Sequence, residues 1–194
     1  MVYIEKVLTN QKAFENRVNE ISKNLGINSD WLMVVMFAES KLNHLAKSPN
    51  SSAVGLIQFT ETARRLIGAT TEQILNTTNV GQLTYVERYF NAMGAKGKMK
   101  SLYDVYFYVF APVAVGKPDT AVIYRSPSGA YTGNKALDTD KNSAITVGEI
   151  KAFVNRYKPA NMETSNGSNL WVLFVALIVL TFLFRNQILK LLNI

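Results

Sequence analysis

Residues 31–42 read WLMVVMFAESKL, and we expect the centre of the fold to form around them. The first eight residues carry no charge, so a helix through them is apolar on every face and has to be buried. The run ends at a carboxylate, Glu39, which is followed by a hydroxyl, Ser40. Glu39 is either the point where a buried helix meets water or an acid held beside an apolar wall for chemistry. A carboxyl that loses water on one side has a raised pKa, as a general acid needs at neutral pH.

The rest of residues 1–159 follows a helical period of 3.6 over most of its length. Helices are expected at residues 4–25, 29–42, 60–67, 71–75, 80–93 and 102–110, and a final amphipathic helix carries Ile150, Phe153, Val154 and Tyr157 on one face. Three prolines, Pro112, Pro118 and Pro127, mark an irregular region. The expected fold class is therefore all-α or α-rich.

The composition limits the partners and the kinds of site. The chain has 194 residues, a net charge of +7 and no cysteine. Disulfides and thiolate metal sites are therefore excluded. The positive charge favours an acidic partner such as nucleic acid, anionic lipid or an anionic cell wall. No dense basic run or recognition motif supports nucleic acid, so we expect none as a partner.

The C-terminal part differs from the rest in its hydropathy. Residues 170–184 read LWVLFVALIVLTFLF and contain no charge. As a helix they span roughly 22 Å, which is short of the roughly 30 Å of a bilayer core, although an apolar pattern continues beyond Arg185. Residues 160–169, ANMETSNGSN, are typical of a linker. We therefore expect a domain at 1–159, a linker at 160–169, and a transmembrane anchor helix with a short tail at 170–194. A buried core helix is the alternative.

A second motif, AVGLIQF at residues 53–59, follows the acid. Gly55 lets the backbone bend sharply or come close to a ligand. The amide of Gln58 can both donate and accept hydrogen bonds, which suits sugar hydroxyls and N-acetyl groups. A plain junction between a loop and a helix is the other interpretation.

Together these motifs carry a family resemblance. The stretch WLMVVMFAESKLNHLAKSPNSSAVGLIQFTETARRLIG resembles the catalytic core of the soluble-lytic-transglycosylase-like family, in a variety common among bacteriophage cell-wall enzymes. The segments VGQLTYVERYF at 80–90 and YFYVFAPVAVGKPD at 106–119 are similar to that variety. The likeness covers roughly residues 20–158. It implies a lysozyme-like, α-rich fold with a cleft for glycan strands.

The resemblance also implies roles for single residues. Glu39 would be the catalytic acid and base at the MurNAc–GlcNAc linkage, and Ser40 would orient it or the substrate. Gly55 and Gln58 would belong to the substrate site. Many family members carry a Tyr-Asn-Ala-Gly element where this chain reads Tyr108-Val-Phe-Ala-Pro, so Tyr108 is the expected tyrosine of the cleft, with Tyr106 as the alternative.

The implied reaction needs one carboxyl and no cofactor. In a lytic transglycosylase the muramic 6-hydroxyl closes onto C1 and leaves a 1,6-anhydro end, whereas most glycosidases use two carboxylates. Glu61 and Asp104 are candidates for a second acid, but neither lies in a supporting motif. A hydrolytic muramidase of the same fold, or a non-enzymatic virion structural or docking protein that keeps this fold, is the alternative.

A third motif, DTDKNSAITVGE at residues 138–149, allows two interpretations. It matches a twelve-residue calcium loop whose ligands would be Asp138, Asp140, Asn142, the Ala144 carbonyl and Glu149. Ser143 stands where that loop has a glycine. The alternative is a turn followed by the capping box Thr146-x-x-Glu149. Either arrangement would hold the last helix in place.

The expected location follows from the anchor and the resemblance. The N-terminus shows no continuous apolar segment of a secretory signal. We expect a membrane-tethered enzyme of a bacteriophage, in the virion's internal membrane or the host inner membrane, with its catalytic domain facing the wall. Its partners would be glycan strands, a lipid bilayer through residues 170–184 and other virion proteins, during genome entry or host lysis.

Overall fold

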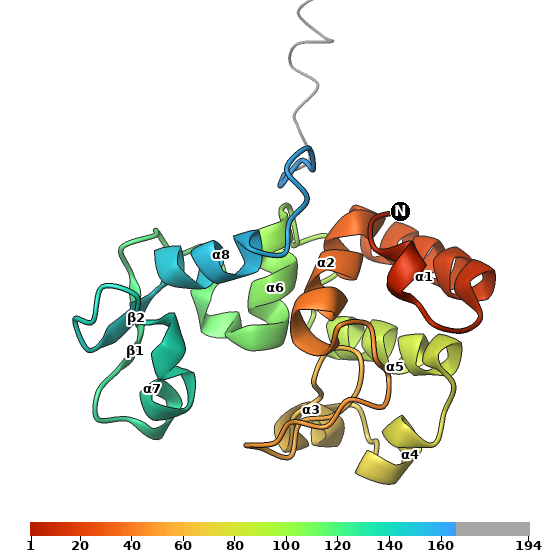
Figure 1. Cartoon of the computed structure of the whole chain (residues 1–194), viewed down its shortest axis with the longest axis horizontal. Coiled ribbons are helices and arrows are strands. Elements are labelled where there is room, and N and C mark those ends of the chain that lie inside the picture. The colour runs from red at the N-terminus through yellow and green to blue at the C-terminus, as the bar shows by residue number, and fades with distance from the viewer. Residues whose placement is uncertain (166–194) are drawn as a thin grey trace, which may run out of the picture. The chain divides into compact units, whose positions relative to one another are not determined.

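The computed structural model describes residues 1–165, and these form an α-rich domain (Figure 1). Its helices are α1 (Gln11–Leu25), α2 (Ser29–Ser40), α3 (Glu61–Leu66), α4 (Thr71–Leu75), α5 (Asn79–Ala92), α6 (Leu102–Phe110), α7 (Gly129–Asn134) and α8 (Val147–Asn155). Short 3₁₀ turns occupy Ile4–Lys6, Pro112–Ala114 and Lys135–Leu137. One small antiparallel sheet joins β1 (Val122–Arg125) and β2 (Ala144–Thr146). The predicted α-rich class is confirmed for the described residues.

Helix α2 is the central helix of the domain. It contacts α1, α6 and α8, and all six residues from Trp31 to Met36 are buried. The helix begins where the Asn28 side chain accepts a hydrogen bond from the Asp30 N–H, as an N-cap does. It ends at Ser40, because the backbone turns left-handed at Lys41. This is the buried helix that the apolar run predicts.

The first helix is shorter than predicted. A helix was expected over residues 4–25, but α1 begins at Gln11 after a left-handed Asn10. The amide of Asn79 donates to the Thr9 carbonyl at 2.7 Å, and the Tyr3 ring stacks on Phe37 with centroids 4.1 Å apart. These tertiary contacts bend the first ten residues away from the helix axis, and asparagine tolerates the left-handed turn better than most residues.

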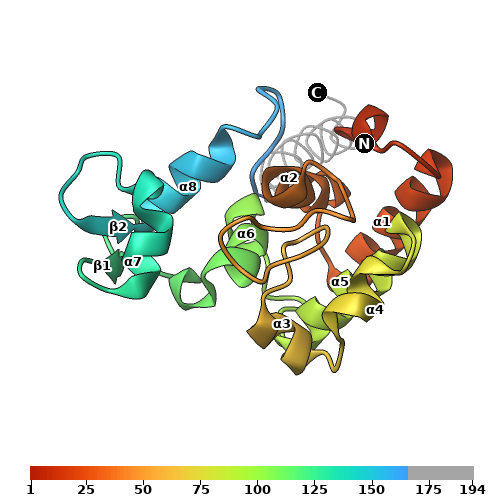
Figure 2. The same ribbon diagram turned by 60° about the horizontal axis from the view of Figure 1, so that its bottom comes forward.

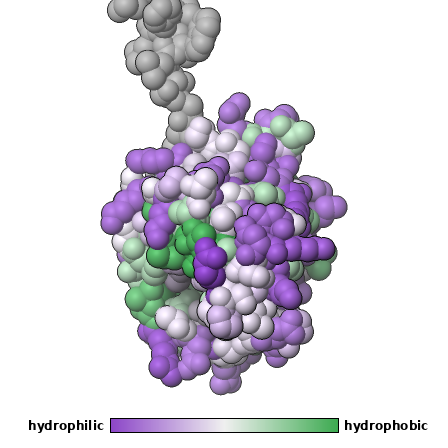
Figure 3. Space-filling view, turned by 90° about the vertical axis from the view of Figure 1, so that its left-hand side faces the viewer, coloured by the Kyte–Doolittle hydropathy of each residue, from purple (hydrophilic) through white to green (hydrophobic). Residues whose placement is uncertain are grey.

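The region around the three prolines contains the sheet, α7 and two 3₁₀ turns. Figures 1 and 2 both show β1, β2 and α7 on one side of α6, with α1 and α5 on the other. The sheet pairs Tyr124 with Ile145 and Arg125 with Ala144. Figure 3, which looks onto the sheet side, shows apolar surface gathered in one area and polar surface over most of the remainder.

The described chain continues past the expected end of the domain. The indole N–H of Trp31 donates to the Glu163 carbonyl at 2.8 Å, and the N–H of Leu102 donates to the Thr164 carbonyl at 2.7 Å. The first part of the expected linker is therefore bound to the domain. Its last residues and the expected anchor at 170–194 lie outside the described residues. Within residues 1–165, no helix has the length and apolarity to cross a membrane.

Candidate active site

Glu39 lies in the last turn of α2 and opens onto a cleft of about 760 Å³. The cleft is lined by residues from the end of α2, the loop after it, α6, α7 and α8. Its lining residues are Ala38, Glu39, Ser40, Lys41, Ala46, Lys47, Ser48, Pro49, Asn50, Ser51, Ala53, Ile57, Gln58, Thr60, Tyr106, Val109, Phe110, Gly133, Asn134 and Phe153. Within the described part of the chain, Glu39 is the one acidic residue of this lining.

The environment of Glu39 favours the protonated carboxyl. Burial raises its pKa from 4.5 to about 7, although a hydrogen bond with Tyr106 and the positive charge of Lys41 act in the opposite direction. Burial and the neighbouring Glu39 carboxylate raise the pKa of the Tyr106 hydroxyl well above its ordinary value, so this hydroxyl keeps its proton. Glu39 is therefore an acid that can give and take a proton near neutral pH, as the sequence predicts for a general acid.

Lys41 is held close to the acid by the end of the helix. Its backbone is left-handed with φ of 55°, and its ammonium group lies 3.2 Å from the Phe37 carbonyl and 3.4 Å from the Ala38 carbonyl. The same group lies 4.1 Å from the centre of the Tyr157 ring. Carbonyls and ring faces both attract a cation. These contacts hold a positive charge where it stabilises an ionised Glu39.

The loop of residues 53–59 forms the wall that carries Gln58. Gln58 lines the cleft in a left-handed conformation (φ 52°), and its side-chain amide donates to the Gly55 carbonyl at 3.1 Å. The Ser40 hydroxyl lies 2.9 Å from the Leu56 carbonyl oxygen and 3.0 Å from the Met36 carbonyl oxygen. Ser40 was expected to orient Glu39 or the substrate. Its hydroxyl instead donates to these main-chain carbonyls, and the bond to Leu56 connects the wall to α2.

Gln82 completes the wall, although it belongs to none of the sequence motifs. It lies on α5, is fully buried, and accepts from the Leu56 N–H at 2.6 Å. Its amide donates to the His44 carbonyl at 2.9 Å and to the Ile74 carbonyl at 2.8 Å. A signal was present in the sequence, because Gln82 stands on the same face of its helix as the buried apolar residues Leu83, Val86 and Phe90. A polar side chain on such a face needs buried partners.

Gly55, which was expected in the substrate site, has a structural role in the wall. It does not line the cleft, and its φ of 79° is one that glycine adopts without strain. A Cβ atom at this position would come within 2.5 Å of the Gln82 side-chain oxygen. The glycine is therefore needed so that the wall can approach α5 closely.

Tyr106, and not Tyr108, is the tyrosine of the cleft. Tyr108 is buried away from the cleft lining, and its carbonyl accepts a hydrogen bond from the Tyr89 hydroxyl at 2.6 Å. The structure therefore favours the alternative, Tyr106, over the expected Tyr108. The two residues are two positions apart on α6, so they point to different sides of the helix. The side of α6 that meets α2 decides which of them reaches Glu39.

The carboxylates of the two candidates for a second acid, Asp104 and Glu61, have partners outside the cleft. Asp104 accepts hydrogen bonds from the Lys100 N–H at 2.8 Å and the Ser101 hydroxyl at 2.9 Å at the start of α6. Glu61 pairs with Arg65 on α3. Neither lines the cleft.

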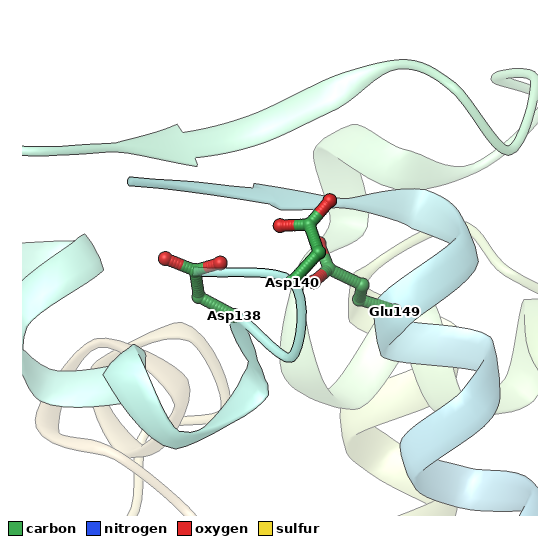
Figure 4. Close-up of side chains that lie close together, drawn as sticks. All are labelled: Asp138, Asp140 and Glu149. Atoms are coloured by element: carbon green, nitrogen blue, oxygen red, sulfur yellow. The ribbon is translucent and has the colours of Figure 1, made fainter. Parts of the chain in front are cut away.

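The loop of residues 138–149 has the capping box and also a cluster of carboxylates. Both hydrogen bonds of the box between Thr146 and Glu149 are present, so this interpretation is confirmed. Carboxylate oxygens of Asp138, Asp140 and Glu149 also lie within 4.8 Å of one another (Figure 4). Ser143 takes the left-handed conformation (φ 67°) that glycine has in a calcium loop.

The carboxylates of this loop already have protein partners. Asp138 accepts from the Tyr131 hydroxyl at 2.7 Å and from the Asn142 and Ser143 N–H groups, and these bonds lower its pKa. Glu149 accepts from the N–H groups of Thr139 and Thr146 at 2.8 and 2.9 Å. Calcium binding by Asp138, Asp140, Asn142, Ala144 and Glu149 stays a prediction.

Comparison with protein families agrees with this geometry. The family model described as the transglycosylase SLT domain matches residues 16–108, which is just under half of the chain. The matched range contains Glu39, the wall of residues 53–59, Gln82 and Tyr106. It ends before Asn134 and Phe153, which complete the cleft. No curated protein matches the sequence. The match supports a transglycosylase-type, lysozyme-like domain that acts on peptidoglycan.

Proposed function

We propose that this protein is a peptidoglycan lytic transglycosylase that cleaves the MurNAc–GlcNAc β-1,4 linkage and leaves a 1,6-anhydro-MurNAc end. The observation that carries the proposal is a single acid, Glu39, with a pKa of about 7 in a cleft whose described lining holds no second carboxylate. A glycosidase that activates water usually needs two carboxyl groups, one on each side of the bond. A muramic hydroxyl that attacks its own ring removes this need.

The proposed reaction uses Glu39 twice. The protonated carboxyl first gives its proton to the glycosidic oxygen, and the bond from C1 of MurNAc to that oxygen breaks. The Glu39 carboxylate then takes the proton of the C6 hydroxyl while O6 bonds to C1, so the acid returns to its starting form and no water is consumed. Between the two steps Glu39 is ionised, and the Tyr106 hydroxyl and the Lys41 charge stabilise it.

The remainder of the cleft suits a glycan strand. Gln58, Asn50 and Asn134 present amides, which can bond to hydroxyl and N-acetyl groups. Phe110 and Phe153 present aromatic surface, on which the apolar faces of sugar rings can pack.

Analysis of the products from purified sacculi tests this proposal. Wild-type protein should release fragments with 1,6-anhydro ends in mass spectrometry, and Glu39→Gln should release none. Glu61→Gln is the matched control, because Glu61 lies outside the cleft, and it should keep its activity. Fragments with reducing ends would instead identify a hydrolytic muramidase. Intact sacculi would favour a non-enzymatic virion protein that keeps this fold.

We further propose that residues 170–184 tether the enzyme to a membrane, as part of a bacteriophage that opens the wall during genome entry or host lysis. This rests on the uncharged run in the sequence and on the resemblance to phage enzymes. Membrane flotation of the full chain tests the tether, with a chain that ends at residue 165 as the control. Equal flotation of the two chains would contradict the proposed membrane tether.

A further inference from the structure

Three aromatic rings connect the first residues of the chain to the segment after α8, beside the end of α2. The Tyr3 ring stacks on Phe37 of α2 with centroids 4.1 Å apart, and the Tyr3 hydroxyl donates to the Tyr157 carbonyl at 2.6 Å. The Tyr157 ring meets Phe37 edge-on, with centroids 6.2 Å apart, and Phe153 of α8 at 5.4 Å. We call these residues the Tyr3–Phe37–Tyr157 ring cluster.

The ammonium group of Lys41 lies against this ring cluster. It is 4.1 Å from the centre of the Tyr157 ring and 5.0 Å from the centre of the Phe37 ring. It also donates to the Phe37 and Ala38 carbonyls at the end of the helix, at 3.2 and 3.4 Å. Lys41 is exposed, so water competes for its ammonium group, and a long flexible side chain loses entropy when it is held. The ring faces therefore help to decide where this charge lies.

Few ionisable groups reach the acid. The ionisable residues of the described cleft lining are Glu39, Lys41, Lys47 and Tyr106. Of these, Tyr106 and Lys41 lower the pKa of the Glu39 carboxyl, while Tyr124 and Tyr157 raise the pKa of Tyr106. The buried residues of α1 and α8, the other helices that contact α2, include no ionisable side chain. Lys41 is thus the cation of the described lining that acts on Glu39.

We propose that Tyr157 is a positioning residue of the proposed reaction, whose ring holds the Lys41 ammonium group where it favours the Glu39 carboxylate left after proton transfer. The inference rests on the proposed function. Tyr157 does not line the cleft, so it acts through Lys41, and the hydroxyl of Tyr3 holds Tyr157 in turn. Lys41 falls within the matched residues 16–108, whereas Tyr3 and Tyr157 fall outside them. Segments on both sides of the matched range therefore contribute to the site.

A titration of Glu39 that needs no substrate tests this proposal. NMR of the full chain in detergent, isotope-labelled at the glutamate carboxyl carbons, follows the Glu39 signal, which Glu39→Gln identifies by its loss. The midpoint of wild type should lie near pH 7. Lys41→Met removes the charge and should raise the midpoint by about half a pH unit. Tyr157→Leu removes the ring and should raise the midpoint by less, whereas Tyr157→Phe keeps the ring and should leave the midpoint unchanged.

Two further variants separate positioning from a general effect on the fold. Lys41→Met combined with Tyr157→Leu should give the midpoint of Lys41→Met alone, because the ring acts through the ammonium group. Tyr3→Phe keeps the stack on Phe37 but removes the bond to the Tyr157 carbonyl, so it should raise the midpoint slightly. The pH at which sacculus cleavage falls by half should move with the midpoint in each variant.

The matched control is Tyr103→Leu. The Lys151 ammonium group lies 5.2 Å from the centre of the Tyr103 ring, and neither residue lines the cleft. Loss of this ring should leave the Glu39 midpoint at the wild-type value.

The proposal is overturned if Tyr157→Leu leaves the midpoint unchanged, or if Tyr157→Phe raises it as much as Tyr157→Leu does. A midpoint of the combined variant above that of Lys41→Met alone would also overturn it. Sacculi left intact by wild type would instead overturn the proposed function. Because the NMR titration needs no substrate, the two failures can be told apart.

Discussion

Ser40 and Gln82 bind the same residue of the cleft wall, because the Ser40 hydroxyl lies 2.9 Å from the Leu56 carbonyl oxygen and the Gln82 side-chain oxygen lies 2.6 Å from the Leu56 nitrogen. Ser40 directly follows Glu39 in α2, and Gln82 belongs to α5. The distance from the acid to Gln58 is therefore set by two helices that hold one loop between them.

Removing Gln82 should destabilise the protein strongly. Gln82→Met leaves the Leu56 N–H and the His44 and Ile74 carbonyls without their buried partner, and each such group costs about 1–3 kcal/mol. We expect a loss of about 3 kcal/mol or more in urea unfolding. Thr84→Ala, at an exposed position of the same helix, should change stability by less than about 0.5 kcal/mol. Equal stability of the two variants would contradict this role of Gln82.

The activity should depend on pH through Glu39. Because the free enzyme must carry a protonated Glu39, kcat/KM should fall about tenfold per pH unit above about pH 7. Tyr106→Phe removes a hydrogen bond that stabilises the carboxylate, so the pKa rises and the fall should begin at a higher pH. Activity measured from pH 5 to 9 checks both statements.

The control for this pH profile is Tyr108→Phe. Tyr108 does not line the cleft, so its removal should leave the midpoint of the fall unchanged. A midpoint that moves with Tyr108 and not with Tyr106 would contradict the assignment of the cleft tyrosine.

Glu39→Gln should stabilise the folded protein at alkaline pH. A carboxyl whose pKa rises from 4.5 to about 7 on folding stabilises the fold most below pH 4.5, and this contribution is lost as the pH rises through 7. The neutral amide does not ionise. We therefore expect the variant to be more stable than wild type at pH 8 by about 3 kcal/mol, or a Tm higher by about 6–12 °C.

The same comparison at pH 4 is the internal control. Both side chains are then uncharged, and the difference in Tm should disappear. A difference that stays constant between pH 4 and pH 8 would show that burial of the charge is not its cause.

Glu149 should stabilise α8 through its hydrogen bonds. Glu149→Ala removes the acceptor of the Thr139 and Thr146 N–H groups, so unfolding should require about 1–2 kcal/mol less. The calcium-loop prediction requires in addition that calcium raise the Tm of wild type and that Asp140→Asn weaken this effect. If neither calcium nor a chelator changes the Tm of wild type, helix capping is the role of Glu149.

The sequence by itself determined the features that depend on neighbouring residues. The apolar run at residues 31–38 places a buried helix in the domain and Glu39 at its end, because burial of a helix follows from its own side chains. The capping box at Thr146 was readable for the same reason. The motifs around Glu39 and Gln58 carried the family resemblance that implied a cleft, and both residues line the cleft of the structure.

Only the tertiary structure decided which distant residues meet at the acid. The choice of Tyr106 over Tyr108 depends on how α6 packs against α2, and the role of Gln82 depends on three segments that converge on one buried amide. The absence of a second carboxylate from the described cleft lining likewise depends on which segments the fold brings to the cleft. Helix periodicity reports which face of a helix is buried, but the partner of that face is set by the packing of the whole core.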